Sequence, residues 1–145
     1  MDINNTLSEF QLNNTRIIRC VLENDFIDLP LKGIENNLSI GNPNHKIIKK
    51  DNLLFGILQL QINNVAEEKS TDRKLSISLV IEGLFSFSGD DEDVFRKMLF
   101  LNGNSTLYSI ARAHIHSVTS MALNSGRVLL PMINFLKLAE EMEKE

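Results

Sequence analysis

The stretch Leu107–Phe135, LYSIARAHIHSVTSMALNSGRVLLPMINF, decides how this chain folds. Its first half repeats apolar residues at spacings of three and four, which predicts an amphipathic helix about four turns long. Those residues are Leu107, Ile110, Ala111, Ile115, Val118, Met121 and Ala122. An apolar linker containing Pro131 follows, and a last helix is expected to begin near 131–134. The stretch therefore predicts two helices joined by a short apolar segment.

The boundaries of the first helix carry their own signals. Asn104 or Ser105 can cap its start, and Gly126 is placed to stop it. The acidic cluster 90–93 precedes a shorter apolar-periodic piece, and acids suit a helix start because they complement its dipole. The triplet 102–104, Asn-Gly-Asn, is expected to end that piece.

The first half of the chain has the pattern of β-strands. Strands are expected at 10–23, 45–50, 53–65 and 75–87, because these runs are rich in β-branched residues. Residues 36–43 have the composition of a turn between strands, and residues 66–74 that of a charged hairpin loop. Strands first and helices second favour the α+β class: a four-stranded antiparallel sheet with two main helices packed on one face, in a single domain spanning 1–145.

Alternation along the strands predicts which face is buried. The strand expected at 75–87 has an apolar residue at every second position, namely Leu75, Ile77, Leu79 and Ile81. The apolar set of the preceding strand is Phe55, Ile57, Leu60 and Ile62. Val21, Leu58 and Val80 fall out of phase with this pattern. We therefore expect the second face of the sheet to be partly apolar, and exposed apolar area of that kind usually marks an interface.

Composition excludes several classes of partner. The net charge is -4, and no basic cluster is larger than Lys46, Lys49 and Lys50, which argues against nucleic acid. The longest apolar runs, 53–60 and 128–133, are too short to span a membrane, and the N-terminus does not resemble a signal peptide. Cys20 is the one cysteine, so no intrachain disulfide can form, which fits a reducing cytosol. We expect a cytoplasmic protein.

No arrangement of residues indicates catalysis. Neither a phosphate-binding GxxxxGK[ST] loop nor a GxSxG nucleophile elbow is present. His114 and His116 are two positions apart on a helix and point about 200° apart, so they cannot bind one metal ion together. The acidic cluster 90–93 lacks the spacing of a calcium loop. The sequence therefore predicts no enzyme activity, no metal site and no cofactor.

Three blocks in order resemble the SecB family of export chaperones. The first is Phe10-Gln11-Leu12 with Arg16-Ile17, which is similar to that family's first strand, FQIQRIY. The second is GLFSFSG at 83–89, which is similar to its GIFSIAG. The third joins Leu107-Tyr108, Ala111-Arg112 and 130–135, which resemble its LFPYAR helix and the linker to its PVNF-like helix start. The resemblance implies a dimer of dimers that captures unfolded or slowly folding polypeptides in the cytosol without ATP.

The resemblance also implies which residues act. The client-binding groove would contain Leu84, Phe85, Phe87, Val128, Leu129, Leu130, Ile133, Phe135 and Leu138. Phe85 is equally compatible with a place in the core. The oligomer interface would contain Ile110, Ala111, His114, Ile115 and Val118, with a contribution from the edge of the first strand. On this basis Phe135→Asp is expected to weaken client binding and to leave the fold intact.

The sequence departs from the family where its members dock the SecA translocation motor. That family uses acidic residues on the sheet surface, and Glu23 matches one of them. The other two positions fall on Arg19 and Ser78, which reverse one charge and remove another. In the linker block, Ser109 replaces a proline and Pro131 is displaced by one position. General chaperoning of preprotein clients is therefore better supported than coupling to SecA, and protection of an antitoxin client, known in one branch of the family, stays open.

A different class of function would use the same apolar faces of the predicted helices. They would serve equally well in a structural or regulatory homo-oligomer whose apolar surfaces are consumed by self-assembly. A binding module for one specific partner, of the antitoxin type, is a further alternative. The residues alone do not separate these from a general client groove.

Overall fold

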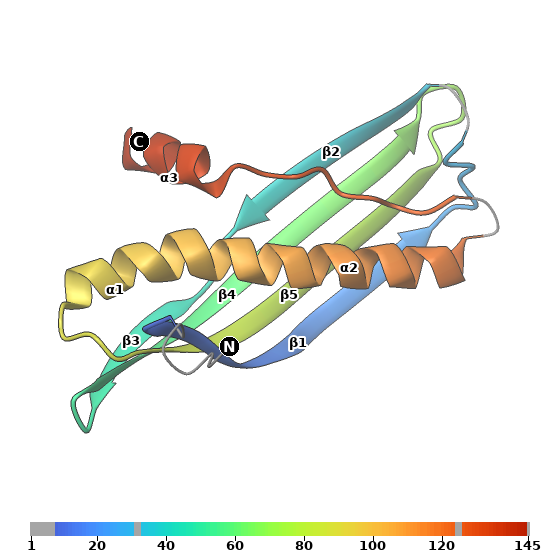
Figure 1. Ribbon diagram of the computed structural model, residues 1–145. Coiled ribbons are helices and arrows are strands. Elements are labelled where there is room, and N and C mark those ends of the chain that lie inside the picture. The colour runs from blue at the N-terminus through green and yellow to red at the C-terminus, as the bar shows by residue number, and fades with distance from the viewer. Residues whose placement is uncertain (1–7, 31–32, 124–125, 145) are drawn as a thin grey trace, which may run out of the picture.

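The computed structural model describes residues 8–30, 33–123 and 126–144. A long antiparallel sheet forms one layer, and a long helix crosses one face of it (Figure 1). The strands are β1 (Phe10–Asn24), β2 (Ile34–Gly41), β3 (His45–Lys50), β4 (Leu53–Glu68) and β5 (Lys74–Phe87). Their order across the sheet is β1-β5-β4-β2, and β3 also pairs with β4. The class is α+β, as predicted.

The fifth strand arises from an interrupted edge. β2 pairs with the second half of β4, where Leu38 lies opposite Asn64, and β3 pairs with the first half, where Ile48 lies opposite Phe55. The break between them is held by Asn42, whose Nδ2 donates to the Gln59 carbonyl at 2.8 Å. The sheet thus has four positions across its width, one of which is divided into two strands.

The prediction of a turn at 36–43 is wrong, because most of this segment belongs to β2. Asparagine and glycine disfavour strands, but pairing with the well-ordered β4 outweighs that local preference. Only Leu38 and Ile40 are apolar there, and both are partly buried on the face that carries the helices. The charged loop is also shorter than expected, since β4 continues to Glu68 and β5 begins at Lys74.

The helical layer is continuous where a break was predicted. α1 (Glu92–Met98) passes through the π-helical turn η2 (Leu99–Gly103) into α2 (Asn104–Ala122), so the triplet 102–104 ends no helix and neither Asn104 nor Ser105 caps one. Gly103 instead lets the helix approach the sheet, since a Cβ there would lie 3.1 Å from Leu58 Cδ2. The acidic cluster does open a helix: Asp91 Oδ1 accepts hydrogen bonds from the Asp93 and Val94 backbone N–H groups.

The C-terminal part contains α3 (Phe135–Lys144), which begins one residue after the predicted start at 131–134. α2 ends at Ala122, and Leu123 is already extended, so Gly126 does not terminate this helix. Gly126 has a φ of 82°, and a Cβ there would lie 2.9 Å from Leu29 Cβ. The glycine thus permits a tight approach of the chain to the segment that follows β1.

The core lies between the sheet and the helices. Alternate residues of β4 and β5 are buried against α2, including Leu58, Leu60 and Ile62. Leu58 therefore faces inward, contrary to the prediction, whereas Phe55 and Ile57 lie on the open face of the sheet. The register explains this, because β4 alternates without interruption from Leu54 to Glu68.

The open face is partly apolar, as expected, and two of the three residues predicted for it lie there. Val80 lies there, opposite Arg19 of β1, and Val21 lies opposite Ser78. Phe55, Ile57 and Leu84 form a larger apolar group toward the other end of the sheet. Within the described ranges, no helix is long and apolar enough to cross a membrane.

Candidate functional site

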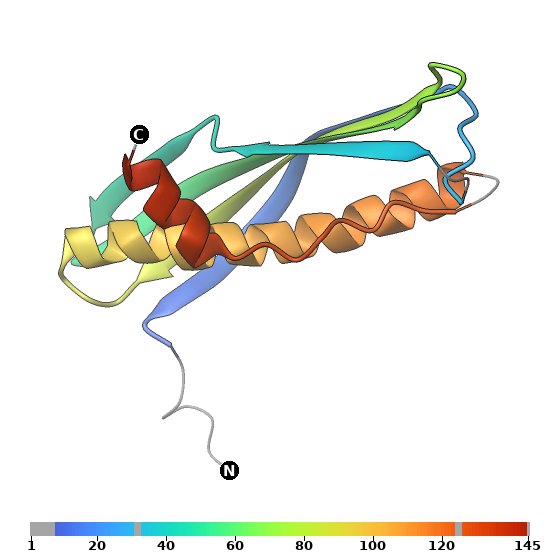
Figure 2. The ribbon, with the colours of Figure 1, turned by 90° about the horizontal axis from the view of Figure 1, so that it is seen from above.

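The segment from 126 to 134, called here the linker, is extended and runs back along α2 toward α3 (Figure 2). Its residues alternate between buried and exposed. Val128 and Leu130 are buried, whereas Leu129 is 63% exposed and Met132 is 81% exposed. One row of apolar side chains therefore anchors the linker, and the other row faces solvent.

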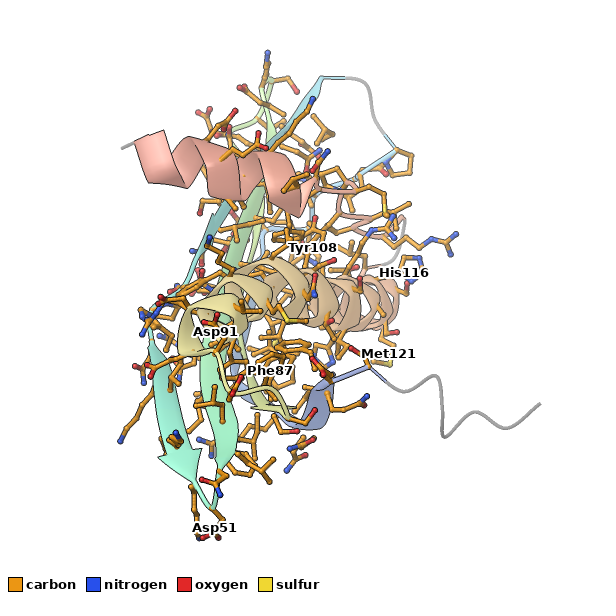
Figure 3. All side chains as sticks on the ribbon, turned by 60° about the vertical axis from the view of Figure 1, so that its left-hand side comes forward. Asp51, Phe87, Asp91, Tyr108, His116 and Met121 are labelled. Atoms are coloured by element: carbon orange, nitrogen blue, oxygen red, sulfur yellow. The ribbon has the colours of Figure 1, made fainter. Side chains whose placement is uncertain are left out.

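Three side chains of α2 fix the linker in place. The buried Thr119 hydroxyl accepts a hydrogen bond from the Val128 N–H at 2.9 Å. Arg112 Nε donates to the Leu130 carbonyl at 2.6 Å, and the Tyr108 hydroxyl donates to the Pro131 carbonyl at 2.5 Å. Figure 3 shows Tyr108 on the side of α2 that faces α3. These bonds satisfy main-chain groups that have no strand beside them to pair with.

Burial raises the pKa of the Tyr108 phenol, although the nearby Arg112 charge lowers it. The phenol therefore keeps its proton at neutral pH and remains a donor to the linker.

The first cavity, called here the linker pocket, lies between the linker and β2. Its volume is about 460 Å3. It is lined by Leu29, Ile34, Asn36, Leu38, Asn64, Arg127, Val128, Leu129, Leu130 and Pro131. Most of this lining is apolar, and Asn64 of β4 lies at its base.

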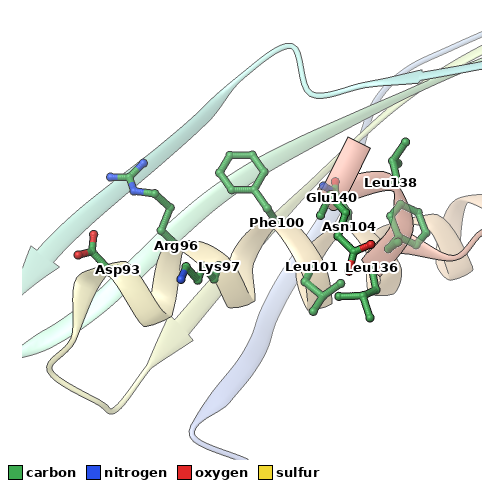
Figure 4. Close-up of a pocket in the computed structure, with 11 residues that line it drawn as sticks. Asp93, Arg96, Lys97, Phe100, Leu101, Asn104, Leu136, Leu138 and Glu140 are labelled. Carbon is green, nitrogen blue, oxygen red and sulfur yellow. The ribbon is translucent and has the colours of Figure 1, made fainter. Parts of the chain in front are cut away.

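The second cavity, called here the α3 pocket, lies between α3 and the α1–η2–α2 helix and measures about 620 Å3 (Figure 4). It is lined by Asp93, Arg96, Lys97, Phe100, Leu101, Asn104, Phe135, Leu136, Leu138, Ala139 and Glu140. The figure shows charged side chains of α1 toward one end and Leu136 and Leu138 of α3 toward the other. The α3 pocket thus has charged side chains from both of its walls, whereas most of the residues that line the linker pocket are apolar.

Helix α3 is positioned mainly by its first residues. The Asn134 side chain accepts a hydrogen bond from the Lys137 N–H at 3.1 Å, which caps the helix. The buried Phe135 ring packs edge-on against Tyr108, with ring centroids 5.5 Å apart. Leu136, the next residue, is 56% exposed and contributes to the α3 pocket.

The predicted groove residues divide into separate groups. Val128, Leu129 and Leu130 line the linker pocket, Phe135 and Leu138 line the α3 pocket, and Ile133 is partly buried between them. Phe85 and Phe87 are buried in the core and have no surface to offer a ligand. Leu84 lies on the open face of the sheet, away from both pockets, because the strand alternation places it opposite Phe85.

Sequence reasoning missed the far walls of both pockets. In the linker pocket these are Leu29, Ile34, Leu38 and Asn64, and in the α3 pocket they are Phe100, Leu101 and Leu136. The β2 residues were missed because that segment resembles a turn. The apolar alternation of Leu38 and Ile40 was the available signal.

The predicted oligomer residues also divide into two sets. Ala111 and Ile115 are fully buried against the sheet of their own chain, so they belong to the core and cannot contact a partner. Ile110, His114 and Val118 keep surface on α2 at spacings of four. Ile17 and Ile18 of the neighbouring edge strand β1 are exposed as well.

The positions compared with a motor-docking surface lie on the open face of the sheet. Arg19 is paired with Val80, Glu23 with Ser76, and Ser78 with Val21. The acidic Glu82 on this face is already engaged, since it accepts from Gln59 at 2.8 Å and from Arg16 at 2.8 Å.

The hydrogen bond from Gln59, with the smaller effects of Arg16, holds the Glu82 pKa below its ordinary value despite burial. Glu82 is thus ionised and paired. Among the described side chains, no group of three or more His, Cys, Asp or Glu is placed to hold a metal ion.

No protein-family model matches the sequence, and no curated protein matches it. Among solved structures, the chain is similar to the Rv1957 SecB-like chaperone of Mycobacterium tuberculosis, solved in complex with a ChAD peptide from the HigA1 antitoxin. The TM-score is 0.67 at 14% identity, over 86% of this chain and 90% of that one. A protein of unknown function from Streptococcus agalactiae is similar at a TM-score of 0.48 and 14% identity, over 85% of this chain and 97% of that one. The chain therefore has a SecB-like fold.

Proposed function

We propose that this protein is a chaperone that binds extended polypeptide segments in the linker pocket and the α3 pocket. The observation that carries the proposal is the linker itself. It is fixed by α2 through main-chain hydrogen bonds, and it turns Leu129 and Met132 toward solvent between two cavities. The solved SecB-like chaperone with a similar fold is in complex with a peptide, which supports this type of ligand. The proposal includes no catalysis.

The physics of such binding is non-directional. Apolar client side chains gain about 25 cal/mol per Å2 of area removed from water, whatever their sequence. The cavities are of the size of small-ligand sites, about 300–1,000 Å3, so each accepts only a few side chains. One long client would occupy both pockets, and the two weak contacts would then reinforce each other. Unfolded chains are captured because their apolar residues are available, whereas folded clients keep theirs buried.

Assembly belongs to the proposal. The outward residues Ile110, His114 and Val118 of α2, with the exposed edge of β1, are proposed to contact a second copy of the chain, as the resemblance to the family implies. An unpaired edge strand is a ready template for pairing. Copies joined in this way would multiply the number of pockets that one client can reach.

The client class follows from the same argument. Both a preprotein and an antitoxin segment offer extended apolar stretches, and the peptide in the related structure comes from an antitoxin. Coupling to a SecA motor is left out of the proposal. The open sheet face carries Arg19 and a paired Glu82 in place of a free acidic cluster.

Suppression of aggregation tests this function. A chemically denatured client would be diluted with an equal molar amount of the protein while light scattering is recorded. We expect the protein to delay aggregation and the double variant Leu129→Asp/Leu136→Asp to lose most of this effect. Leu84→Asp is the control, because Leu84 is an exposed leucine on the opposite face of the sheet, away from both pockets. Failure of the wild-type protein to delay aggregation would reject the proposal.

A further inference from the structure

The linker pocket has an unpaired carboxamide at its base. Asn64 is 3% exposed, and its Nδ2 has no hydrogen-bond partner in the part of the chain that the structure describes. A buried amide without a partner is destabilising, because folding removes its water contacts and supplies nothing in exchange. The same side chain lines a pocket whose other walls are mostly apolar. The pocket is therefore suited to an occupant that brings a polar group to this position.

A second carboxamide lies beside the first. In the pairing of β2 with β4, Leu38 lies opposite Asn64 and Asn36 lies opposite Ala66, so Asn36 is a diagonal neighbour of Asn64 on the same face. Asn36 also lines the pocket, nearer to solvent. Each carboxamide carries a donor and an acceptor side by side. An extended polypeptide presents the same combination, since its N–H and C=O groups alternate along each edge.

We propose that Asn64, with Asn36 above it, hydrogen-bonds the main chain of a client segment that lies extended in the linker pocket. This inference rests on the proposed function and names what the pocket recognises. A client N–H donates to a carboxamide oxygen, and a client C=O accepts from Nδ2. Rotation about the Asn64 Cβ–Cγ bond presents either end of the amide to the pocket.

This arrangement explains how a pocket can be selective for unfolded chains without reading their sequence. Apolar walls formed by Ile34, Leu38 and Val128 accept varied side chains. Main-chain groups are already paired in a folded client but free in an unfolded one. The carboxamide therefore adds a hydrogen bond that only an unfolded segment can form.

Two variants and two peptides test the inference. The variants are Asn64→Leu, which keeps the branched shape and removes both polar atoms, and Asn63→Leu, a control on the other face of the same strand. The probes are a short fluorescein-labelled peptide of alternating leucine and serine, and the same peptide with one central amide replaced by a trans-alkene, which removes one N–H and one C=O and keeps the extended shape. Binding is measured by fluorescence anisotropy, and stability by thermal unfolding.

We expect the alkene replacement to weaken binding to the wild type by about fivefold to tenfold, the value of one hydrogen bond in a desolvated site. Asn64→Leu is expected to weaken binding of the all-amide peptide by the same factor and to abolish the difference between the two peptides. It should also raise the Tm, because an unpaired buried amide is removed. Asn63→Leu should change neither the affinity nor the preference.

Equal binding of both peptides by the wild type, or unchanged affinity in Asn64→Leu, would overturn the inference while groove binding itself stood. Absence of binding by the wild type would overturn both the inference and the proposed function. A rise in Tm without a change in affinity would assign Asn64 a structural role only.

Discussion

The linker pocket and the α3 pocket lie on the same side of the sheet but are built differently. The linker pocket has extended backbone on two walls, β2 paired to β4 and the linker bonded to Thr119, Arg112 and Tyr108. The α3 pocket has helices on its walls, and α3 is attached by apolar packing, with the Phe135 ring against Tyr108 and Leu138 against the core. One pocket is fixed by hydrogen bonds to the main chain of its walls, and the other by the packing of apolar side chains.

This difference indicates separate roles in client binding. A wall fixed by hydrogen bonds keeps its shape, so the linker pocket suits recognition of a feature common to all extended chains. A wall held by apolar packing can shift, and the charged residues Asp93, Arg96 and Glu140 make the α3 pocket tolerant of polar client residues. Changes in the two regions should therefore have different effects on stability and on binding.

The largest expected effect is local. Phe135→Ala should remove about 3 kcal/mol from the docking of α3, the lower end of the range for a buried phenylalanine. Because α3 docks through Phe135 and Leu138 and pairs with no strand of the sheet, we expect the detached population of α3 to increase about hundredfold while the sheet stays folded. Hydrogen exchange at the amides of α3 measures this. The buried ring also revises the expectation that Phe135→Asp would leave the fold intact, since a charge there should detach α3 as well.

A uniform loss of protection throughout the sheet in Phe135→Ala would contradict the picture of α3 as a loosely attached wall.

A smaller but global effect is expected at the start of the linker. Thr119→Val keeps the shape of the side chain but leaves the Val128 N–H without its acceptor inside the protein. We expect unfolding to be favoured by about 1–3 kcal/mol, measured by urea denaturation. Ser120→Ala is the control, because its hydroxyl bonds only to the His116 carbonyl of its own helix. An equal loss of unfolding free energy in the two variants would show that the hydrogen bond from Val128 to Thr119 contributes no more to stability than the Ser120 bond within the helix.

Acid should loosen the linker pocket in particular. Hydrogen bonds from the Thr71 hydroxyl and the Asp28 backbone N–H lower the Glu68 pKa, an effect larger than the opposing effect of burial. A depressed folded-state pKa gives stability that is present above the ordinary glutamate pKa of about 4.3 and lost as pH falls through the folded value. The Asp28 bond holds the segment that carries Leu29, one wall of the pocket.

Glu68→Gln should therefore reduce the loss of unfolding free energy as the pH falls from about 5 to about 3, through and below the ordinary glutamate pKa, measured by denaturation at several pH values. Glu67→Gln, on the opposite face of β4, serves as the control. Identical slopes in Glu68→Gln and the wild type would contradict this assignment.

The smallest effect on stability should accompany a clear effect on binding. Leu129→Ser and Leu136→Ser alter exposed side chains, so each should change the unfolding free energy by no more than about 0.5 kcal/mol. Each should nevertheless weaken binding of an unfolded polypeptide, because each lines one pocket. If only one of the two variants weakens binding, the pocket lined by the other residue does not bind the client.

Much of this architecture follows from sequence patterns that are regular over many residues. The alternation at 75–87 and the three-four spacing at 107–122 each persist for several repeats, and both elements are where they were predicted. β2 could not be predicted, because its asparagines disfavour a strand and its pairing with β4 is a long-range contact. The continuity of α1 with α2 was hidden for a similar reason: Gly103 resembles a helix stop, yet it is there to let the helix approach Leu58.

Only the walls formed by the linker and the last helix could be predicted from the sequence. Leu129, Leu130 and Leu138 stand in the apolar linker and last helix, where a pattern reveals them. The family resemblance placed Leu84 and Phe85 in one groove, but neighbours in a strand point to opposite faces, and Phe85 is buried while Leu84 is not. Asn64 could not be found, because its importance depends on an unpaired atom that only the packed structure reveals.

Fluorescence anisotropy of one labelled client, in folded form and in a permanently unfolded, reduced and carboxymethylated form, tests the central claim most directly. We predict that the wild-type protein binds the unfolded form and not the folded form, and that Leu129→Asp/Leu136→Asp weakens this binding at least about tenfold while Leu84→Asp does not. Equal binding of the folded and unfolded forms, or an equal loss in Leu84→Asp, would contradict the assignment of the two pockets as the client-binding site.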